Sequence, residues 1–268
     1  MIDDIFMIRL PIYQVKFEEN KNYDMSTKRG KKNLRDILLE TGKGYCMYCY
    51  SKINIDKKNY GHLEHTVESK IVPDLKKCHY NLSIACPTCN SSSKSKEEKQ
   101  RRIGVESFIC DKVNCMESPC KDYYLNTNKY LNNMIEKKLE KIIMQPRGII
   151  ESYTGEKNYF EIEYNLLQQE FVPLNNKEYS EKVIKYIKSH IDKFNLNDEE
   201  YRTEEIKKVV EYVIEYENIP KKDYFNNYIA ELFIEKLEVF LKESSSSKME
   251  KVKKICIIIR EAILLKYR

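Results

Sequence analysis

The sequence predicts an α+β protein, in which a small zinc-clipped module of two strands and a helix is embedded in a mostly α-helical chain. The first observation is two Cys-x-x-Cys pairs separated by 36 residues, Cys46 with Cys49 and Cys86 with Cys89. The second is that apolar residues beyond position 126 recur at helical spacing. The 268 residues therefore divide into an N-terminal segment, a cysteine-rich module and a mostly helical region: 1–40, 41–125 and 126–268.

The N-terminal segment predicts one short helix. An apolar stretch, residues 6–13, is followed by a basic stretch and then by apolar residues at helical spacing: Leu34, Ile37 and Leu38. Gly42 and Gly44 interrupt this pattern, so we expect the helix to end before the module begins.

The module predicts two strands followed by a helix. Residues 60–65 form the first expected strand, after a turn at residues 56–59, and residues 81–85 form the second. Asn90 and the serines after it can cap the exposed N–H groups of a first helical turn, so a helix is expected to begin there. The cysteine pairs flank these elements and would hold them together.

The mostly helical region shows three amphipathic patterns and an apolar final segment. The patterned positions are Val183, Ile184, Ile187, Ile191 and Phe194; Ile206, Val209, Val210, Val213 and Ile214; and Phe225, Ile229, Leu232, Phe233 and Leu237. Residues 255–265 predict a buried last helix, packed in its own bundle or against a partner. His190 lies among lysines and is predicted to face solvent. Residues 149–164 predict a β-hairpin, because Thr154-Gly155 separates β-prone runs.

The two cysteine pairs predict a structural zinc site. Each pair supplies two thiolates from one tight turn, and two such turns complete a tetrahedral shell. Buried free cysteines or a redox pair are the alternatives, but a redox pair usually opens a helix in a βαβ pattern and leaves the second pair without a role. A second zinc site is a further hypothesis, with ligands from Cys110, Cys115, Cys120 and either Cys78 or His79.

The sequence also predicts a cytoplasmic location without a membrane partner. No apolar signal segment opens the chain, and no apolar run is long enough to cross a membrane. In a reducing compartment thiols stay reduced, which favours metal binding over disulfides.

Positive charge is concentrated on the module. Residues 41–102 carry 12 Lys or Arg and 6 Asp or Glu, a net charge of +6, whereas the whole chain has a net charge of +5. Such an excess attracts a phosphate backbone, so DNA is the expected partner and RNA the alternative. A lysine-rich surface that only aids solubility explains the charge equally simply. The candidate nucleic-acid-binding residues are His62, Lys70, Lys94 and Lys96.

Glu64, His65 and Asn90 are the groups that metal-dependent phosphodiester hydrolysis would need. A histidine titrates near neutral pH and can take a proton from an attacking water. A carboxylate and an amide oxygen suit Mg²⁺, which would neutralise charge on the leaving oxygen. Two alternatives stay open: a non-catalytic zinc module that binds nucleic acid, and an interaction protein whose helical region is the working part. Neither gives these three residues a role.

Three short motifs are framed by the cysteine pairs: Glu64-His65, Asn81-Leu82 and Cys89-Asn90. With them, residues 45–99 resemble the HNH (ββα-metal) endonucleases. The resemblance implies that His65 is the general base and that Glu64 and Asn90 ligate a catalytic Mg²⁺ or Mn²⁺. It also implies that Asn81 holds the loop behind the base. Many members have an aspartate in place of Glu64 and a histidine in place of Asn90, and a proline common after the base is absent here.

Further residues carry a narrower resemblance: Gly44-Tyr45 before the first cysteine pair, Lys70 after the base, and residues 192–197 in the helical region. Together they are similar to the HNH subunits of Septu-type and retron-linked antiphage systems, which work beside an ABC-type ATPase. This chain lacks the spacing of a phosphate-binding loop, so an ATPase function would have to come from a partner. The resemblance implies a partner ATPase, and the apolar last helix leads us to expect that the helical region docks onto an ATPase or onto another copy of the chain.

Overall fold

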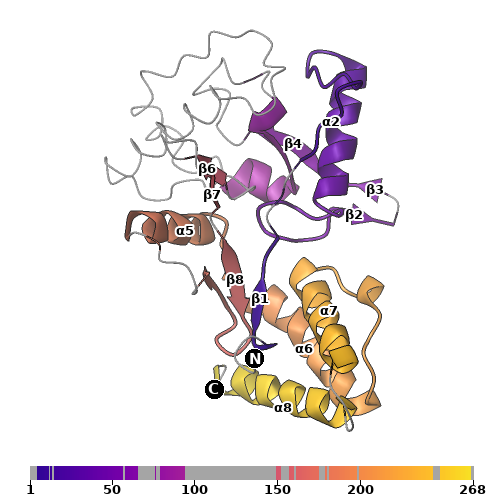
Figure 1. The fold of residues 1–268 in the computed structure, drawn as a ribbon, viewed down its shortest axis with the longest axis vertical. Helices are drawn as coiled ribbons and strands as arrows, with labels where there is room; N and C mark the ends of the chain where they lie inside the picture. The colour runs from indigo at the N-terminus through magenta and orange to yellow at the C-terminus, as the bar shows by residue number, and fades with distance from the viewer. Residues whose placement is uncertain are drawn as a thin grey trace.

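The structure, a computed structural model, combines helices with small antiparallel sheets, as the predicted α+β class requires (Figure 1). It describes residues 5–11, 13, 15–56, 58–65, 76, 79–93, 149–151, 157–159, 161–174, 179, 181–197, 199–243 and 248–266. Among these residues, no helix combines the length and the apolar character needed to cross a membrane.

Helix α2 (Lys28–Thr41) is the helix predicted in the N-terminal segment. It begins after Thr27, whose side-chain hydroxyl accepts a hydrogen bond from the backbone N–H of Gly30 at 3.0 Å, and it ends at Gly42. The helix buries Leu34 and Leu38, and it contacts the strands that carry the candidate site. The apolar spacing in the sequence therefore identified both the helix and the face that it packs.

The cysteine-rich module contains the two predicted strands. β2 (Asn54–Ile55) and β3 (Lys58–Asn59) form a small hairpin that leads into β4 (His62–His65). β4 pairs antiparallel with β5 (Leu82–Ala85), so that His62 lies opposite Ala85 and Glu64 opposite Ser83. A short π-helical segment, η3 (Thr88–Ser93), follows β5. The order of strand, strand and helical turn is therefore present, and the continuation of the predicted helix lies outside the described residues.

Gly61 marks the tight entry into β4, and it gives a first testable prediction. Its N–H donates to Asn59 Oδ1 at 2.6 Å, and an added Cβ would lie 2.8 Å from side-chain carbons of both Ile53 and Ile84. We expect Gly61→Ala to lower the free energy of unfolding by about 1–3 kcal/mol, because the buried isoleucines must move. Chemical denaturation of the zinc-loaded protein measures the loss. Lys58→Ala, on an exposed position of β3, is the control; equal unfolding midpoints for the two variants would contradict the prediction.

A second sheet joins the beginning of the chain to its C-terminal region. β1 (Met7–Arg9) pairs with β8 (Ile162–Asn165), which pairs in turn with β9 (Glu170–Pro173), all antiparallel. Within the predicted hairpin at residues 149–164, β6 (Ile149–Glu151) pairs with β7 (Lys157–Tyr159), but residues 162–164 belong to β8 and not to the hairpin. The segment after it leaves this hairpin for the second sheet, which the sequence analysis did not predict.

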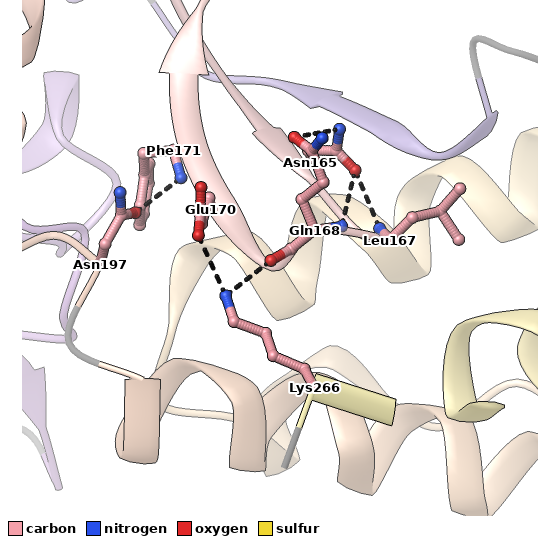
Figure 2. A network of polar contacts seen from close by, with 7 residues as sticks. All are labelled: Asn165, Leu167, Gln168, Glu170, Phe171, Asn197 and Lys266. Atoms are coloured by element: carbon pink, nitrogen blue, oxygen red, sulfur yellow. Dashed lines mark hydrogen bonds and ion pairs between the residues drawn. The ribbon is translucent and has the colours of Figure 1, made fainter. Parts of the chain in front are cut away.

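Polar side chains hold the β8–β9 turn together and fasten it to the last helix (Figure 2). The Asn165 carboxamide oxygen accepts hydrogen bonds from the backbone N–H groups of Leu167 and Gln168, at 2.9 and 3.0 Å. At the end of the last helix, the Lys266 ammonium donates to the Gln168 carbonyl at 2.7 Å and pairs with Glu170 at 3.2 Å. The final helix is therefore attached to the sheet as well as to its helical neighbours.

The helices of the C-terminal region are present as predicted. They are α5 (Glu181–Lys193), α6 (Glu199–Tyr216), α7 (Tyr228–Glu243) and α8 (Lys248–Lys266). α8 packs against α6 and α7 and buries Val252, Cys256, Ile259 and Ile263. Its other face exposes Ile258, Leu264 and Leu265, and Leu265 is 69% exposed.

The prediction that His190 faces solvent is wrong. His190 is only 1% exposed, and its ring lies against those of Tyr48 and Phe194. Its position follows from helical spacing, since it shares the face of α5 that carries Ile187, Ile191 and Phe194. Lys185 and Lys188 are exposed on other faces of the helix and were the misleading signal, whereas Lys193 is itself buried.

Candidate metal centre and active site

The four cysteines of the two pairs converge on one point. The Sγ atoms of Cys46, Cys49, Cys86 and Cys89 all lie within 4.8 Å of one another, and those of Cys49 and Cys86 are 3.7 Å apart. A tetrahedral Zn²⁺ with Zn–S bonds of about 2.3 Å would space its sulfurs about 3.8 Å apart. The cluster can therefore hold a metal ion such as zinc.

Backbone hydrogen bonds place the two cysteine turns around β5. In the first turn, Tyr50 N–H donates to the Cys46 carbonyl at 3.0 Å, and Met47 N–H donates to the carbonyl of Ile84 in β5 at 3.0 Å. In the second turn, Cys89 N–H points to Cys86 Sγ at 3.4 Å, a donor that suits a metal-bound thiolate. Because β5 leads directly into Cys86, the strand fixes the distance between the two turns.

Burial and mutual hydrogen bonds shift the pKa values of the four thiols in opposite directions. Burial raises the pKa of the Cys46 thiol well above its usual value, and hydrogen bonds with the other thiols raise that of Cys89. Hydrogen bonds from Cys46 and the neighbouring thiols lower the pKa of Cys49 and of Cys86. Four thiolates so close together repel one another, so all four ionise together only when a metal ion compensates their charge.

Glu64 lies in a buried polar group beside the cysteines. The residue is 3% exposed, and its Oε2 accepts a hydrogen bond from the hydroxyl of Tyr48. The Ser83 hydroxyl lies 3.0 Å from the same oxygen and 3.2 Å from the Tyr48 hydroxyl. Ser83 occupies this place because it lies opposite Glu64 in the β4–β5 pair.

His62 and Asn90 come together on one side of β4. The Asn90 carboxamide nitrogen lies 3.4 Å from His62 Nδ1, although the two residues are far apart in sequence. Alternation along a strand places His62 and Glu64 on the same face, so the carboxylate, the imidazole and the carboxamide share one side of the strand. Asn81 is fully buried at the start of β5. Its role in holding the loop behind the base stays a prediction.

His65, the last residue of β4, is held by a backbone carbonyl. Its Nε2 lies 2.9 Å from the oxygen of Lys76. A carbonyl oxygen can only accept a hydrogen bond, so Nε2 carries the hydrogen and the lone pair of the neutral ring is on Nδ1. Burial lowers the pKa of His65 below its usual value, and the charge of Lys76 acts in the same direction, against the opposing hydrogen bond. At neutral pH the ring is therefore a neutral base with a defined acceptor nitrogen.

No family model, curated protein or solved structure matches the chain significantly. The residues and their geometry are therefore the basis for a functional assignment.

Several predicted residues lie outside the part of the chain that the structure describes. Among the candidate nucleic-acid-binding residues these are Lys70, Lys94 and Lys96, and in the hypothetical second zinc site they are Cys78, Cys110, Cys115 and Cys120. Their roles stay predictions.

Tyr48 and Ser83 are the site residues that the sequence analysis missed. A signal for Tyr48 was present, because it lies between two cysteines of the cluster, whose convergence restricts its position. Ser83 could be found only through the strand register, because residues opposite each other in an antiparallel pair have neighbouring side chains.

Proposed function

We propose that this chain is a metal-dependent endonuclease of the HNH (ββα-metal) type, which hydrolyses phosphodiester bonds in nucleic acid. The observation that carries the proposal is the hydrogen bond between His65 Nε2 and the Lys76 carbonyl. It orients the ring of a neutral histidine at the end of β4, beside the carboxylate residue Glu64. A zinc module that only binds nucleic acid does not require a neutral histidine whose ring is held in one orientation.

In this proposal the cysteine cluster has a structural role. One Zn²⁺ bound by the four thiolates would join the turn before β4 to the turn after β5. A two-stranded pair has little stability in water by itself, so the zinc would supply much of the energy that holds the site together.

The residues on the His62 face fit a catalytic Mg²⁺ or Mn²⁺ by their donor chemistry. The Tyr48 and Ser83 hydroxyls both contact Oε2 of Glu64 and hold the carboxylate, which would be one ligand of the cation. The Asn90 carboxamide nitrogen faces His62, so its oxygen Oδ1 would be the atom that binds a cation. A carboxylate oxygen and an amide oxygen are hard donors that suit these ions, which would supply positive charge at the leaving oxygen.

His65 would act as the general base. Its Nδ1 takes a proton from a water molecule, whose oxygen attacks the phosphorus while the bond to the leaving oxygen breaks. Glu64 and His65 are adjacent in β4, so their side chains lie on opposite faces of the strand. A phosphate that contacts both residues must accordingly lie at the end of the strand, where β4 stops at His65.

DNA is the substrate that we propose first, because the module carries the positive charge of the chain.

We propose further that the helical region docks onto an ATPase or a second copy of the chain. The exposed apolar residues Ile258, Leu264 and Leu265 of α8 support that part of the proposal. Co-purification from the native cell tests it, and a monomer fully active on DNA without added protein would contradict it.

A cleavage assay tests the proposed activity. Zinc-loaded protein is incubated with supercoiled plasmid, linear duplex, single-stranded DNA and RNA, each with Mg²⁺, with Mn²⁺ and with no added divalent ion. We expect cleavage of at least one substrate, dependent on Mg²⁺ or Mn²⁺, because Zn²⁺ in the cysteine cluster has no open coordination position. Tight binding of these substrates without cleavage under any condition would contradict the proposal and favour the non-catalytic zinc module.

A further inference from the structure

We infer that Tyr48 is a positioning residue for the metal-binding carboxylate of Glu64, and that helix α5 holds the tyrosine ring in place. The inference rests on the proposed function, because it concerns the same catalytic ion. It adds a residue that would act on the ion through Glu64 and not as a ligand itself.

The contacts of the Tyr48 hydroxyl are the first support. The hydroxyl donates to Glu64 Oε2, and the Ser83 hydroxyl lies within hydrogen-bonding distance of both groups. A buried carboxylate is costly unless donors compensate its charge, and this pair of hydroxyls satisfies one oxygen from the side of β5. These contacts restrict the rotation of the carboxylate group and therefore set its orientation.

The position of the Tyr48 ring is the second support. The residue lies between the zinc-cluster residues Cys46 and Cys49, so bound zinc would fix its backbone. Its side chain is fully buried, and its ring centroid lies 4.6 Å from that of Phe194 and 6.2 Å from that of His190. His190 lies in α5 and Phe194 directly follows its last residue, so the ring is held by the end of a helix of the C-terminal region. Because both the backbone and the ring of Tyr48 are held, the position of its hydroxyl is fixed.

This arrangement gives the buried His190 a role. A helix face that packs on Tyr48 links the C-terminal region to a proposed catalytic ligand through a single aromatic ring. Substitution of a residue that orients a metal ligand without binding the metal typically changes metal affinity or activity by about 10- to 100-fold.

Tyr48→Phe tests the inference, because it removes the hydroxyl and keeps the ring. The dissociation constant of Mn²⁺ is measured on zinc-loaded protein by electron paramagnetic resonance, together with the zinc content. We expect Mn²⁺ binding to weaken by about 10- to 100-fold, with one zinc retained per chain. The Mn²⁺ concentration that half-activates cleavage should rise by the same factor, and saturating Mn²⁺ should restore much of the rate.

Tyr45→Phe is the matched control. Tyr45 is also buried, adjoins a zinc-cluster cysteine and donates its hydroxyl to a carboxylate, but that carboxylate is Glu231 on α7. The two variants therefore lose the same kind of hydrogen bond. Only Tyr48→Phe should weaken Mn²⁺ binding; an equal weakening in both would show a general loss of stability and overturn the inference.

Other outcomes also decide the question. A Tyr48→Phe protein that binds Mn²⁺ as tightly as the parent overturns the inference. If Tyr48→Phe loses its zinc, Ser83→Ala takes its place, because it removes the neighbouring hydroxyl without changing the cysteine turn, and unchanged Mn²⁺ binding in it likewise overturns the inference. A parent chain that binds Mn²⁺ but cuts no nucleic acid contradicts the proposed function alone, since the comparison of dissociation constants still stands.

Discussion

His65→Ala is expected to reduce the rate of nucleic-acid cleavage by about 10²- to 10⁴-fold, the contribution typical of a general base. The zinc content and the unfolding midpoint should stay close to those of the parent, because His65 contributes one side-chain hydrogen bond, to the Lys76 carbonyl, at the end of a strand. Single-turnover cleavage with saturating Mn²⁺ measures the chemical step separately from metal binding.

Two further variants separate the base from the hydrogen bond. His65→Asn can still donate to the Lys76 carbonyl but has no basic nitrogen, so it should be as inactive as His65→Ala. His79→Ala changes a histidine whose ring packs against Phe17, and should keep the parent rate. A His65→Ala protein that cuts as fast as the parent would show that the base assignment is wrong.

The second large effect is expected from the zinc cluster. Cys46→Ser should abolish zinc binding and unfold the module, because structural zinc sites supply on the order of 10 kcal/mol of folding energy. The loss should extend beyond the module, since the first cysteine turn is part of the main core. Tyr45 stacks on Tyr228 of α7, and Lys52 N–H donates to the Asn226 carbonyl at 3.0 Å. Elemental analysis and thermal unfolding measure the two effects.

Cys256→Ser is the matched control for the zinc cluster. Burial raises the pKa of the Cys256 thiol to about 12, as expected for an isolated cysteine inside a helix bundle. This variant loses some packing energy in α8 but should retain one zinc per chain. A well-folded parent protein without zinc would overturn the assignment of the cysteine cluster.

The parts of the site that could be predicted from sequence are those set by local spacing. Two residues between cysteines force a tight turn, and short strands are expected at residues 60–65 and 81–85, so the cysteine cluster and the β4–β5 pair follow. Helical spacing likewise identified α2 and the helices of the C-terminal region. These features depend on residues close together in the chain, where propensity and periodicity carry information.

What could not be predicted depends on long-range pairing. The sheet β1-β8-β9 joins residues 7–9 to residues 162–173, and no local pattern encodes which strands meet. Residues 149–164 predict a hairpin, yet residues 162–164 lie in this sheet, Glu161 and Glu163 are buried, and Arg9 forms an ion pair with Glu161. The contact of Tyr48 with Glu64 needed both the register of β4 and the position of α5, which packing decides.

The central claim is that a second, oxygen-liganded ion lies beside the zinc cluster. Anomalous scattering from crystals of the zinc-loaded protein grown with Mn²⁺ tests it most directly, because the two metals absorb at different edges. The account predicts a zinc peak among the sulfurs of Cys46, Cys49, Cys86 and Cys89, and a manganese peak about 2.1 Å from oxygens of Glu64 and Asn90. A zinc peak alone, with no manganese bound by Glu64 or Asn90, would contradict the account.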